Sequence, residues 1–463
     1  MSLSEKLQRQ QLTQSSNRLR LMQHGGRDNA SNPSQEKSEF TTSASEIAVQ
    51  LERLRHLQRA KATREPAIDR LIAPELGGEV RENSEGCCLV FRKPYPTLGE
   101  AEVRGHVLGL CGLLTGQTVA DGARVLLLDT ETTGLSGGAG THVFLAGLGF
   151  WDESGFVVEQ YFMRDFHEER AMLADLAQRL GGTDLLLSFN GKSFDLPLLQ
   201  SRFILSRLPW PLSRAVHLDL LYPARRLWRL RLRDCSLGNL EKELFGRERI
   251  GDVPGHLIPH LYFNFARTGV PRGMSQVLEH NRQDICTLVE LCHRMKGLLA
   301  SMTGTMAIEA TDLFSAGKYL RSLGQTRLSF ECHRAALNSL NGQLDPELEC
   351  RVLTSIAELH LTEGQRDDAV ALWERALATA NTLPLRVAER LAVHYEHRVR
   401  KFRKALEISE RALESLERAG PSDYSSGPRI AEWTRRRERL LRKIAKLESG
   451  PARGMGENAG GTG

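Results

Sequence analysis

Apolar and polar residues alternate in two different ways along the chain, and the change divides it into two parts. Short apolar runs bounded by turn-forming residues are typical of buried strands. Such runs lie at 125–128, 143–150, 156–162 and 185–189. Segments with helical periodicity, including 168–180 and 196–205, lie between and after them. The pattern predicts a mixed α/β sheet flanked by helices.

The residues ahead of this sheet have a different composition. Residues 1–75 are rich in Gln, Ser, Arg and Asn, which predicts a largely disordered leader. Residues 76–122 contain a short apolar run at 88–92, bounded by prolines, and we expect a small β-containing lead-in element there. The main domain is then expected over 123–300.

Helical patterns alone continue through residues 306–448, and a repeated spacing appears in them. Three alanines each stand 12 positions after a turn residue: Ala336 after Gly324, Ala376 after Gly364, and Ala412 after Arg400. This rhythm predicts an all-α domain of paired helices and resembles degenerate tetratricopeptide repeats. The alternative, a coiled coil, does not explain turns at a fixed offset. A basic helix at 430–447 is expected to cap the array, and the Gly-rich residues 449–463 to be disordered.

Composition narrows the class of protein. The chain has 463 residues, 41% hydrophobic and 26% charged, which indicates a globular protein with two or three cores. Its apolar runs fall short of the roughly 20 residues that span a bilayer, and its polar start lacks a secretory signal, so we expect a cytoplasmic protein without membrane contact. The eight cysteines contain no Cys-x-x-Cys pair and are expected to be reduced and packed.

The net charge of +5 permits a polyanionic partner without requiring one. Five arginines between 225 and 233 surround Trp228, and a second basic run covers 435–446. Taken alone, such runs are more often solvated helix faces than nucleic-acid contacts.

Two carboxylates mark the end of the apolar run at 125–128. Asp129 and Glu131 are one residue apart, and the alternation of a strand points both to the same side. Neighbouring ionised carboxylates repel each other, and a divalent cation between them relieves the repulsion. We therefore interpret both residues as metal ligands.

A metal site needs further oxygen ligands, and two more acids are candidates. Asp195 follows a strand and a turn and begins a helix, where the alternative role is helix capping. Asp284 lies on a predicted helix whose buried stripe includes Ile285 and Leu288. His280 stands four residues before Asp284 and shares its face, although such a pair taken alone is more often a surface contact.

In this order the four acids resemble the DEDD superfamily of 3′–5′ exonucleases, which have a ribonuclease H-like fold. Over roughly 76–300 the chain is also similar to the bacterial YprB-type ribonuclease H-like family, which often carries C-terminal tetratricopeptide-like repeats. The matching stretches are 189–195, 217–221, 223–228, 235–237, 253–255 and 280–281.

The resemblance implies a two-metal phosphodiesterase site. Asp129, Glu131, Asp195 and Asp284 would hold two Mg²⁺ or Mn²⁺ ions about 4 Å apart. His280 would accept the proton of the attacking water. The chain departs from the family pattern at this base, because a His stands at the spacing where one branch has Tyr and the other branch spaces its His differently.

The nuclease interpretation adds weight to the polar residues near these acids. Guanidinium groups bind phosphate in a bidentate manner, and an indole offers a stacking face to an unpaired base. The residues assigned to nucleic-acid contact are Thr130, Asn190, Lys192, Arg225, Arg226, Trp228 and Arg229. Asp219, after His217, is either an outer-shell acid of the site or a structural residue.

We expect a metal-dependent exonuclease acting on single-stranded or frayed 3′ ends of DNA or RNA, joined to repeats that bind a protein partner or extend the nucleic-acid path. The competing hypothesis is a silent nuclease fold that serves as a binding scaffold. A weaker one is a structure-selective endonuclease. Four intact acids favour the enzyme, because a silent site has little reason to keep charges that repel each other.

Overall fold

The computed structural model describes residues 75–95, 100–134, 140–300, 308–339, 345–418 and 426–448. The leader expected over 1–75, apart from its last residue, and the tail expected over 449–463 lie outside this part of the chain. No helix in the described ranges combines the length and the apolar composition that a membrane span requires.

Described residues between 79 and 219 form a seven-stranded mixed sheet, in the order β1-β2-β5-β4-β3-β6-β7. Strands β3, β6 and β7 are parallel, and the other neighbours are antiparallel. The strands are β1 (Glu79–Asn83), β2 (Gly86–Tyr95), β3 (Val125–Thr132), β4 (Val143–Asp152), β5 (Gly155–Phe162), β6 (Leu185–Ser188) and β7 (Val216–Asp219). The mixed sheet predicted from the apolar runs is confirmed.

The boundary expected at residue 123 is wrong. Strand β2 pairs with β5 along its length, with Leu89 opposite Phe162, so the lead-in segment belongs to the same sheet. The central residues of β2, Cys88 to Phe91, are all buried, which an edge element with one solvated face would not show. Pairing between distant segments decided this boundary, and the local pattern does not contain it.

Helices cover both faces of the sheet, and alternate residues of β3 face them. Val125 and Leu127 belong to one core and Leu126 and Leu128 to the other. The first core is covered by α4 (Glu100–Thr115), α7 (Leu221–Leu232), α8 (Leu237–Phe245) and most of α10 (Met274–Leu299). The second is covered by α5 (Glu169–Leu180), α6 (Asp195–Leu205) and α9 (Ile258–Thr268). The eight cysteines are free, and seven of them are buried, as predicted.

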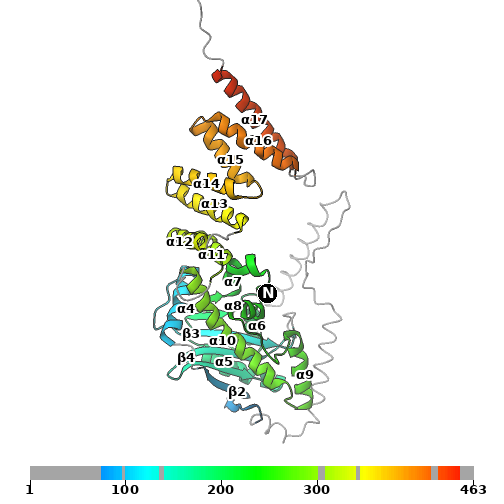
Figure 1. Cartoon of the computed structure of the whole chain (residues 1–463). Coiled ribbons are helices and arrows are strands. Elements are labelled where there is room, and N and C mark those ends of the chain that lie inside the picture. Colours follow the sequence, from blue (N-terminus) through cyan, green and yellow to red (C-terminus); the bar gives the residue numbers. More distant parts are fainter. Residues whose placement is uncertain are drawn as a thin grey trace, which may run out of the picture. The chain divides into compact units, whose positions relative to one another are not determined.

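The long helix α10 crosses the sheet beside α4 (Figure 1). It comes close to β4 because that strand carries glycines under it. A Cβ at Gly149 would stand 2.6 Å from Cγ2 of Ile285, a distance at which one of the two groups must move. A side chain at this position would therefore lift the helix from the sheet.

Paired helices follow the sheet, as the repeated spacing predicts. They are α11 (Ala310–Ser322), α12 (Thr326–Asn338), α13 (Pro346–Thr362), α14 (Arg366–Thr379), α15 (Leu385–Val393), the π-helical segment η3 (His394–Arg398), α16 (Phe402–Arg418) and α17 (Ser426–Glu448). Gly324, Gly364 and Arg400 all have positive φ, at 75°, 79° and 54°. The three alanines 12 positions later are fully buried.

Part of the basic helix α17 serves an internal ion pair. Arg439 Nε and Lys443 Nζ each lie 2.7 Å from Oε1 of Glu396, which is buried. The hydrogen bond from Arg439, with the help of Lys443, lowers the pKa of Glu396 to about 2. Two of the basic residues therefore neutralise a buried acid.

Helix α11 also packs on the part of the chain that forms the sheet and its covering helices. Helix α11 contacts α7, and Leu313 and Phe314 belong to the same core as β3. Arg231 binds the buried Asp312 through two hydrogen bonds of 2.9 and 2.8 Å. The boundary expected between 300 and 306 is therefore no break in the core, and one arginine of the segment around Trp228 is an internal partner.

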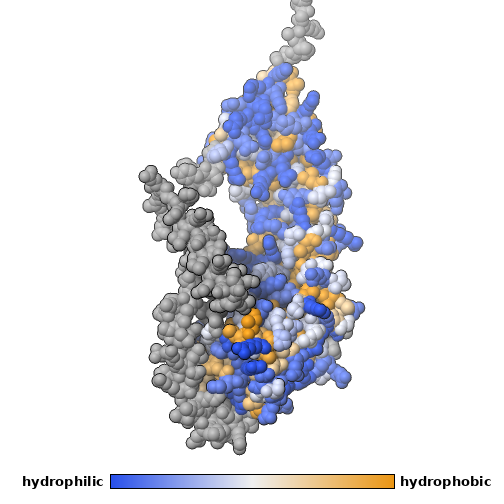
Figure 2. All heavy atoms as spheres, turned by 180° about the vertical axis from the view of Figure 1, so that it is seen from behind, coloured by the Kyte–Doolittle hydropathy of each residue, from blue (hydrophilic) through white to orange (hydrophobic). Residues whose placement is uncertain are grey.

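Hydrophobic and hydrophilic side chains mix over the exposed face of the described part, seen from the side opposite to that of Figure 1 (Figure 2). The exposed large apolar residues include Phe194 on the loop before α6 and Tyr222 at the start of α7. Both lie near the acids described next.

Candidate metal centre

Asp129 and Glu131 lie on the face of β3 that α10 covers, the face to which Val125 and Leu127 also point. Asn281 of α10 donates from Nδ2 to Oδ2 of Asp129 at 2.8 Å and to the Asp129 carbonyl at 3.2 Å. Gln160 of β5 in turn donates to Oδ1 of Asn281 at 2.8 Å. A buried amide pair, which the sequence analysis missed, thus orients the first acid.

Asp195 is the first residue of α6, and its carboxylate does not cap the helix. The position before it is Phe194, and no side chain caps this end. The Asp195 carboxylate instead accepts a 2.5 Å hydrogen bond from Oγ1 of Thr130, on β3 between the first two acids. The structure therefore brings Thr130 and Asp195 together and disfavours the capping role.

His280 and Asp284 stand one turn apart on α10 and face the same region. His280 Nε2 lies 3.9 Å from Oε1 of Glu131 and 3.7 Å from Oδ2 of Asp284. Helical spacing placed the pair on one face, and the crossing of α10 over β3 brings this face to the acids.

Burial is the largest cause that raises the pKa of each of the four carboxyls. It takes the pKa of Asp195 to about 6. For Asp129 the charges of Asp284, Glu131 and Asp195 add to the increase, and for Glu131 those of Asp284 and Asp195 do so. This excess of buried negative charge on hard oxygen atoms fits a divalent cation of the Mg²⁺ or Mn²⁺ type.

Arg249 is a neighbour of the site that the sequence analysis missed. It makes two 2.6 Å hydrogen bonds to Glu241 and one of 2.5 Å from Nη2 to Oδ1 of Asp284. Burial opposes the charged form of Arg249, but Glu241 and Asp284 outweigh burial and raise its pKa. The loop before α9 contains the matching stretch 253–255, but Arg249 lies outside that stretch and local sequence offered no signal for it.

Asp252 is the second missed neighbour. Its Oδ1 lies 2.8 Å from Nδ1 of His280. Burial opposes ionisation of Asp252, but the hydrogen bond and charge of His280 outweigh it and lower the pKa of this carboxyl. An ionised Asp252 favours the tautomer with a proton on Nδ1, which leaves the unprotonated Nε2 on the side of Glu131 and Asp284.

The loop between β6 and α6 is held by Asp219. Its carboxylate accepts the backbone N–H groups of Asn190 at 2.8 Å, Lys192 at 3.0 Å and Leu221 at 3.1 Å. Asn190 has a φ of 66°, in the left-handed region. Of the two roles considered for Asp219, the structural one therefore fits best. This buried acid fixes the conformation of the loop that leads to Asp195.

The prediction that Trp228 stacks on nucleic acid is wrong. Its side chain is 0% exposed and lies in the core under α7, so the indole offers no face to a base. Arg225, Arg226 and Arg229 lie on α7 with exposed side chains. The aromatic residue of α7 that does face solvent is Tyr222, which is 47% exposed.

Tyr222 links α7 to the loop before the third acid. Its hydroxyl lies 3.4 Å from Oγ of Ser193. Phe194, 45% exposed, stands between that serine and Asp195. The exposed Lys192 precedes them in the same loop. Tyr222 has the helical spacing i, i+3, i+7 with Arg225 and Arg229, a signal that could have identified this exposed face from sequence.

Comparisons with known proteins give a family match, a related protein and a solved structure with partial similarity. The family described as the RNase_H superfamily matches residues 126–296, a range that contains all four acids. YprB of Bacillus subtilis (strain 168), described as uncharacterized, is 32% identical over 294 residues, 62% of this chain and 69% of that protein. The family B DNA polymerase of the archaeon Pyrobaculum calidifontis aligns with 12% identity and a TM-score of 0.32, over 52% of this chain and 29% of the polymerase.

Proposed function

The chain belongs to the family of Bacillus subtilis YprB within the RNase_H superfamily, and on this basis we propose that it is a divalent-metal-dependent 3′–5′ exonuclease. One observation carries the proposal: buried carboxylates from β3, α6 and α10 lie close together, so that the charges of Asp284 and Asp195 raise the pKa of both Asp129 and Glu131. Such a cluster is costly to bury without a cation, which argues against a silent scaffold.

The site chemistry follows from this donor set. Asp129, Glu131, Asp195 and Asp284 are the residues that would hold the cations. Two bound Mg²⁺ or Mn²⁺ ions would activate a water molecule and neutralise charge at the leaving oxygen. Asn281 holds the Asp129 carboxylate and Thr130 holds that of Asp195, so both acids are positioned in advance.

His280 is proposed as the general base. Asp252 accepts the hydrogen bond of Nδ1, and Nε2 remains as the proton acceptor near Glu131 and Asp284. A neutral imidazole accepts a proton efficiently near neutral pH. This arrangement gives a physical reason for a histidine at the spacing where part of the DEDD superfamily has a tyrosine.

The proposed substrate path runs from the acids along the loop before α6 and onto α7. Phe194 and Tyr222 offer exposed aromatic rings for stacking of unpaired bases, and cationic groups beside them can bind phosphates. The residues proposed to contact the strand are Thr130, Asn190, Lys192, Phe194, Tyr222, Arg225, Arg226 and Arg229.

The test is degradation of 3′- and 5′-labelled DNA and RNA strands with Mg²⁺ or Mn²⁺, compared with Asp129→Asn and with EDTA. We expect stepwise loss from the 3′ end, and a decrease of at least ~10³-fold in the variant. Glu279→Gln is the matched control, because Glu279 precedes His280 on α10 but is paired with Arg282.

Each alternative gives a distinct result. If the wild type cuts a circular strand internally and Asp129→Asn does not, the protein is an endonuclease and the exonuclease proposal is wrong. Equal inertness of wild type and variant on all substrates, with strand binding retained, would favour the scaffold.

We also propose that the helical repeats bind an acidic peptide of a protein partner. A groove of about 1090 Å³ is lined from α11, α13, α14, α15 and η3, and its lining contains seven lysine or arginine side chains but only three glutamates. Two buried nitrogens of its lining residues, Nε1 of Trp373 and Nδ1 of His394, have no hydrogen-bond partner among the described residues. An unpaired buried polar group is unfavourable, and the backbone of a bound peptide offers both donors and acceptors to such groups.

The lining favours a peptide over a nucleic-acid strand. Leu383, Leu385 and Val387 give part of the groove an apolar character, and glutamates 347, 358 and 389 would repel a continuous row of phosphates. Trp373 is only 3% exposed, so its ring is not a stacking platform. The chain changes from α-helix to π-helix at His394, and such π-helical segments are frequent at functional sites.

Fluorescence polarisation with acidic peptides and with oligonucleotides distinguishes the two ligands. We expect acidic peptides to bind, and Arg351→Glu with Arg390→Glu to weaken binding by ~10-fold or more. Arg437→Glu on the exposed face of α17 is the control. Oligonucleotide binding that the groove variant abolishes, without peptide binding, would assign the groove to the nucleic-acid path.

A further inference from the structure

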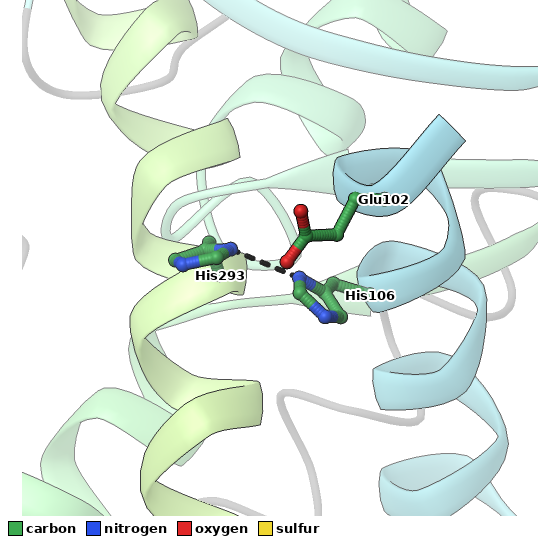
Figure 3. Close-up of side chains that lie close together, drawn as sticks. All are labelled: Glu102, His106 and His293. Carbon is green, nitrogen blue, oxygen red and sulfur yellow. Dashed lines mark hydrogen bonds between the residues drawn. The ribbon is translucent and has the colours of Figure 1, made fainter. Parts of the chain in front are cut away.

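A second group of metal-ligand side chains lies between α4 and α10. Glu102 and His106 stand one turn apart on α4 and project toward His293 of α10 (Figure 3). Within the described ranges, these are the three ligand-type residues whose donor atoms all lie within 4.8 Å of one another. No three of the four carboxylates of the candidate metal centre meet this limit.

The two histidines face each other through the same ring nitrogen. Nδ1 of His106 lies 2.9 Å from Nδ1 of His293, and the ring centroids are 4.8 Å apart. Only one proton fits between these nitrogens, so one ring must be the acceptor. A tetrahedral Zn²⁺ with two nitrogens at about 2.0–2.1 Å separates them by about 3.3 Å, so binding needs a movement of only a few tenths of an ångström.

The donors differ in kind from those of the carboxylate cluster. Two imidazoles and one carboxylate suit Zn²⁺, whereas an all-oxygen set suits Mg²⁺ or Mn²⁺. Glu102 is exposed, so solvent can reach the fourth position. His293 lies nine residues after Asp284 on α10, or about 14 Å along the helix, which makes this a separate site.

One neighbouring charge opposes cation binding. Lys296 follows His293 by three residues on α10, and its Nζ would lie 3.2 Å from a Cβ at Gly109. The Lys296 ammonium thus lies beside the turn of α4 that follows His106. Glu102 supplies the compensating negative charge on the other side of His106.

We propose that Glu102, His106 and His293 bind one Zn²⁺ ion, with water as the fourth ligand, and that the ion holds α4 against α10. This inference does not rest on the nuclease proposal. The site would stiffen the contact between the segment before β3 and the helix that carries His280 and Asp284.

The test uses the full chain, stripped of metal and then kept in excess Mg²⁺ so that the carboxylates are saturated. Zn²⁺ binding is measured by calorimetry, and Co²⁺ is added separately as a spectroscopic probe. We expect one tight site and the visible absorption of four-coordinate Co²⁺. His106→Asn and His293→Asn should each raise the Kd for Zn²⁺ at least ~100-fold, and Glu102→Gln about 10-fold.

Two variants serve as comparisons. Asp129→Asn with Asp195→Asn should leave the Zn²⁺ affinity and the Co²⁺ spectrum unchanged, whatever it does to hydrolysis. His106→Gln offers a second substitution if the asparagine variant unfolds, which circular dichroism will reveal. Absence of a Zn²⁺ site in the folded wild type, or unchanged affinity in folded His106 and His293 variants, would overturn the proposal.

Discussion

Gly147 of β4 lies directly beneath the Asn281 amide of α10. A Cβ built on Gly147 would stand 2.1 Å from Oδ1 of Asn281. The same amide holds the Asp129 carboxylate through its nitrogen. The absence of a side chain at one position in β4 therefore permits the contact that orients a carboxylate on the neighbouring strand.

Gly147→Ala should consequently lower both stability and activity. The added methyl group must displace Asn281, which we expect to destabilise the fold by about 1–3 kcal/mol and to lower hydrolysis by ~10-fold because Asp129 is no longer positioned. Urea unfolding and the strand-degradation assay measure the two effects. Gly238→Ala is the control, since this helical glycine has no atom within 4 Å of the added Cβ. Equal behaviour of the two variants would refute the role of Gly147.

Asp252→Asn should impair proton transfer by His280. An amide in place of the carboxylate can donate to Nδ1, which moves the ring proton to Nε2 and blocks the proposed acceptor. We expect a ~10²-fold decrease in kcat with little change in KM. Asp252→Glu should recover part of the rate. The pH dependence of kcat in this variant should show one basic group, as in the wild type. A change confined to KM would indicate that Asp252 acts in substrate binding.

Substitutions of Trp228 and of the arginines of α7 should have different effects, the first on stability and the others on strand binding. Trp228→Ala should destabilise the protein by about 3–5 kcal/mol, because the indole fills the core. Arg225→Ala and Arg229→Ala should leave stability nearly unchanged but weaken strand binding. The log–log salt dependence of the affinity should become shallower by about 0.7 for each phosphate that is no longer neutralised. Unchanged binding in the double arginine variant would remove α7 from the proposed path.

His333 should make the helical repeats sensitive to acid. Burial lowers the pKa of His333 to about 4, and neither of its ring nitrogens has a partner among the described residues. In the unfolded chain His333 takes up a proton near pH 6.5, whereas in the folded chain it stays neutral until about pH 4. The stability of the folded chain is therefore not reduced by His333 above pH 6.5, and it decreases as the pH falls from 6.5 toward 4. The loss amounts to about 3 kcal/mol.

His333→Leu should flatten this part of the stability profile between pH 7 and pH 4, measured by urea unfolding. His256→Leu, at an exposed histidine, is the control and should leave the profile as in the wild type. A profile of His333→Leu that matches the wild type would show that the ring is hydrated in solution.

Arg400→Gly should stabilise the third repeat turn. Arg400 has a φ of 54°, where Gly324 and Gly364 stand in the other two turns. Relief of the left-handed backbone should exceed the added entropy of the unfolded chain by about 0.5–1 kcal/mol. Arg398→Gly, in η3 and without a positive φ, should instead destabilise by a similar amount. Destabilisation by both glycines would contradict this account of the turn.

The amino-acid sequence by itself determined the features that depend on local periodicity. Apolar runs located five of the strands, and the alternation of β3 placed Asp129 and Glu131 on one face. The 12-residue offset identified three helix pairs, including one whose turn has Arg400 in place of glycine. The order of four acids and the matching stretches indicated a ribonuclease H-like family of the YprB type, and the match to the RNase_H superfamily and the relationship with YprB agree with that assignment.

The tertiary structure alone decided which residues support these acids. Asn281 reaches the site because α10 crosses β3, Arg249 and Asp252 reach it from a loop in which sequence singled out neither, and Trp228 is buried despite its arginine neighbours. Periodicity reports which face of an element is apolar, but it does not report which distant element covers that face. The position of α10 over β3 and β4, permitted by Gly147 and Gly149, is a long-range packing choice that only the folded chain expresses.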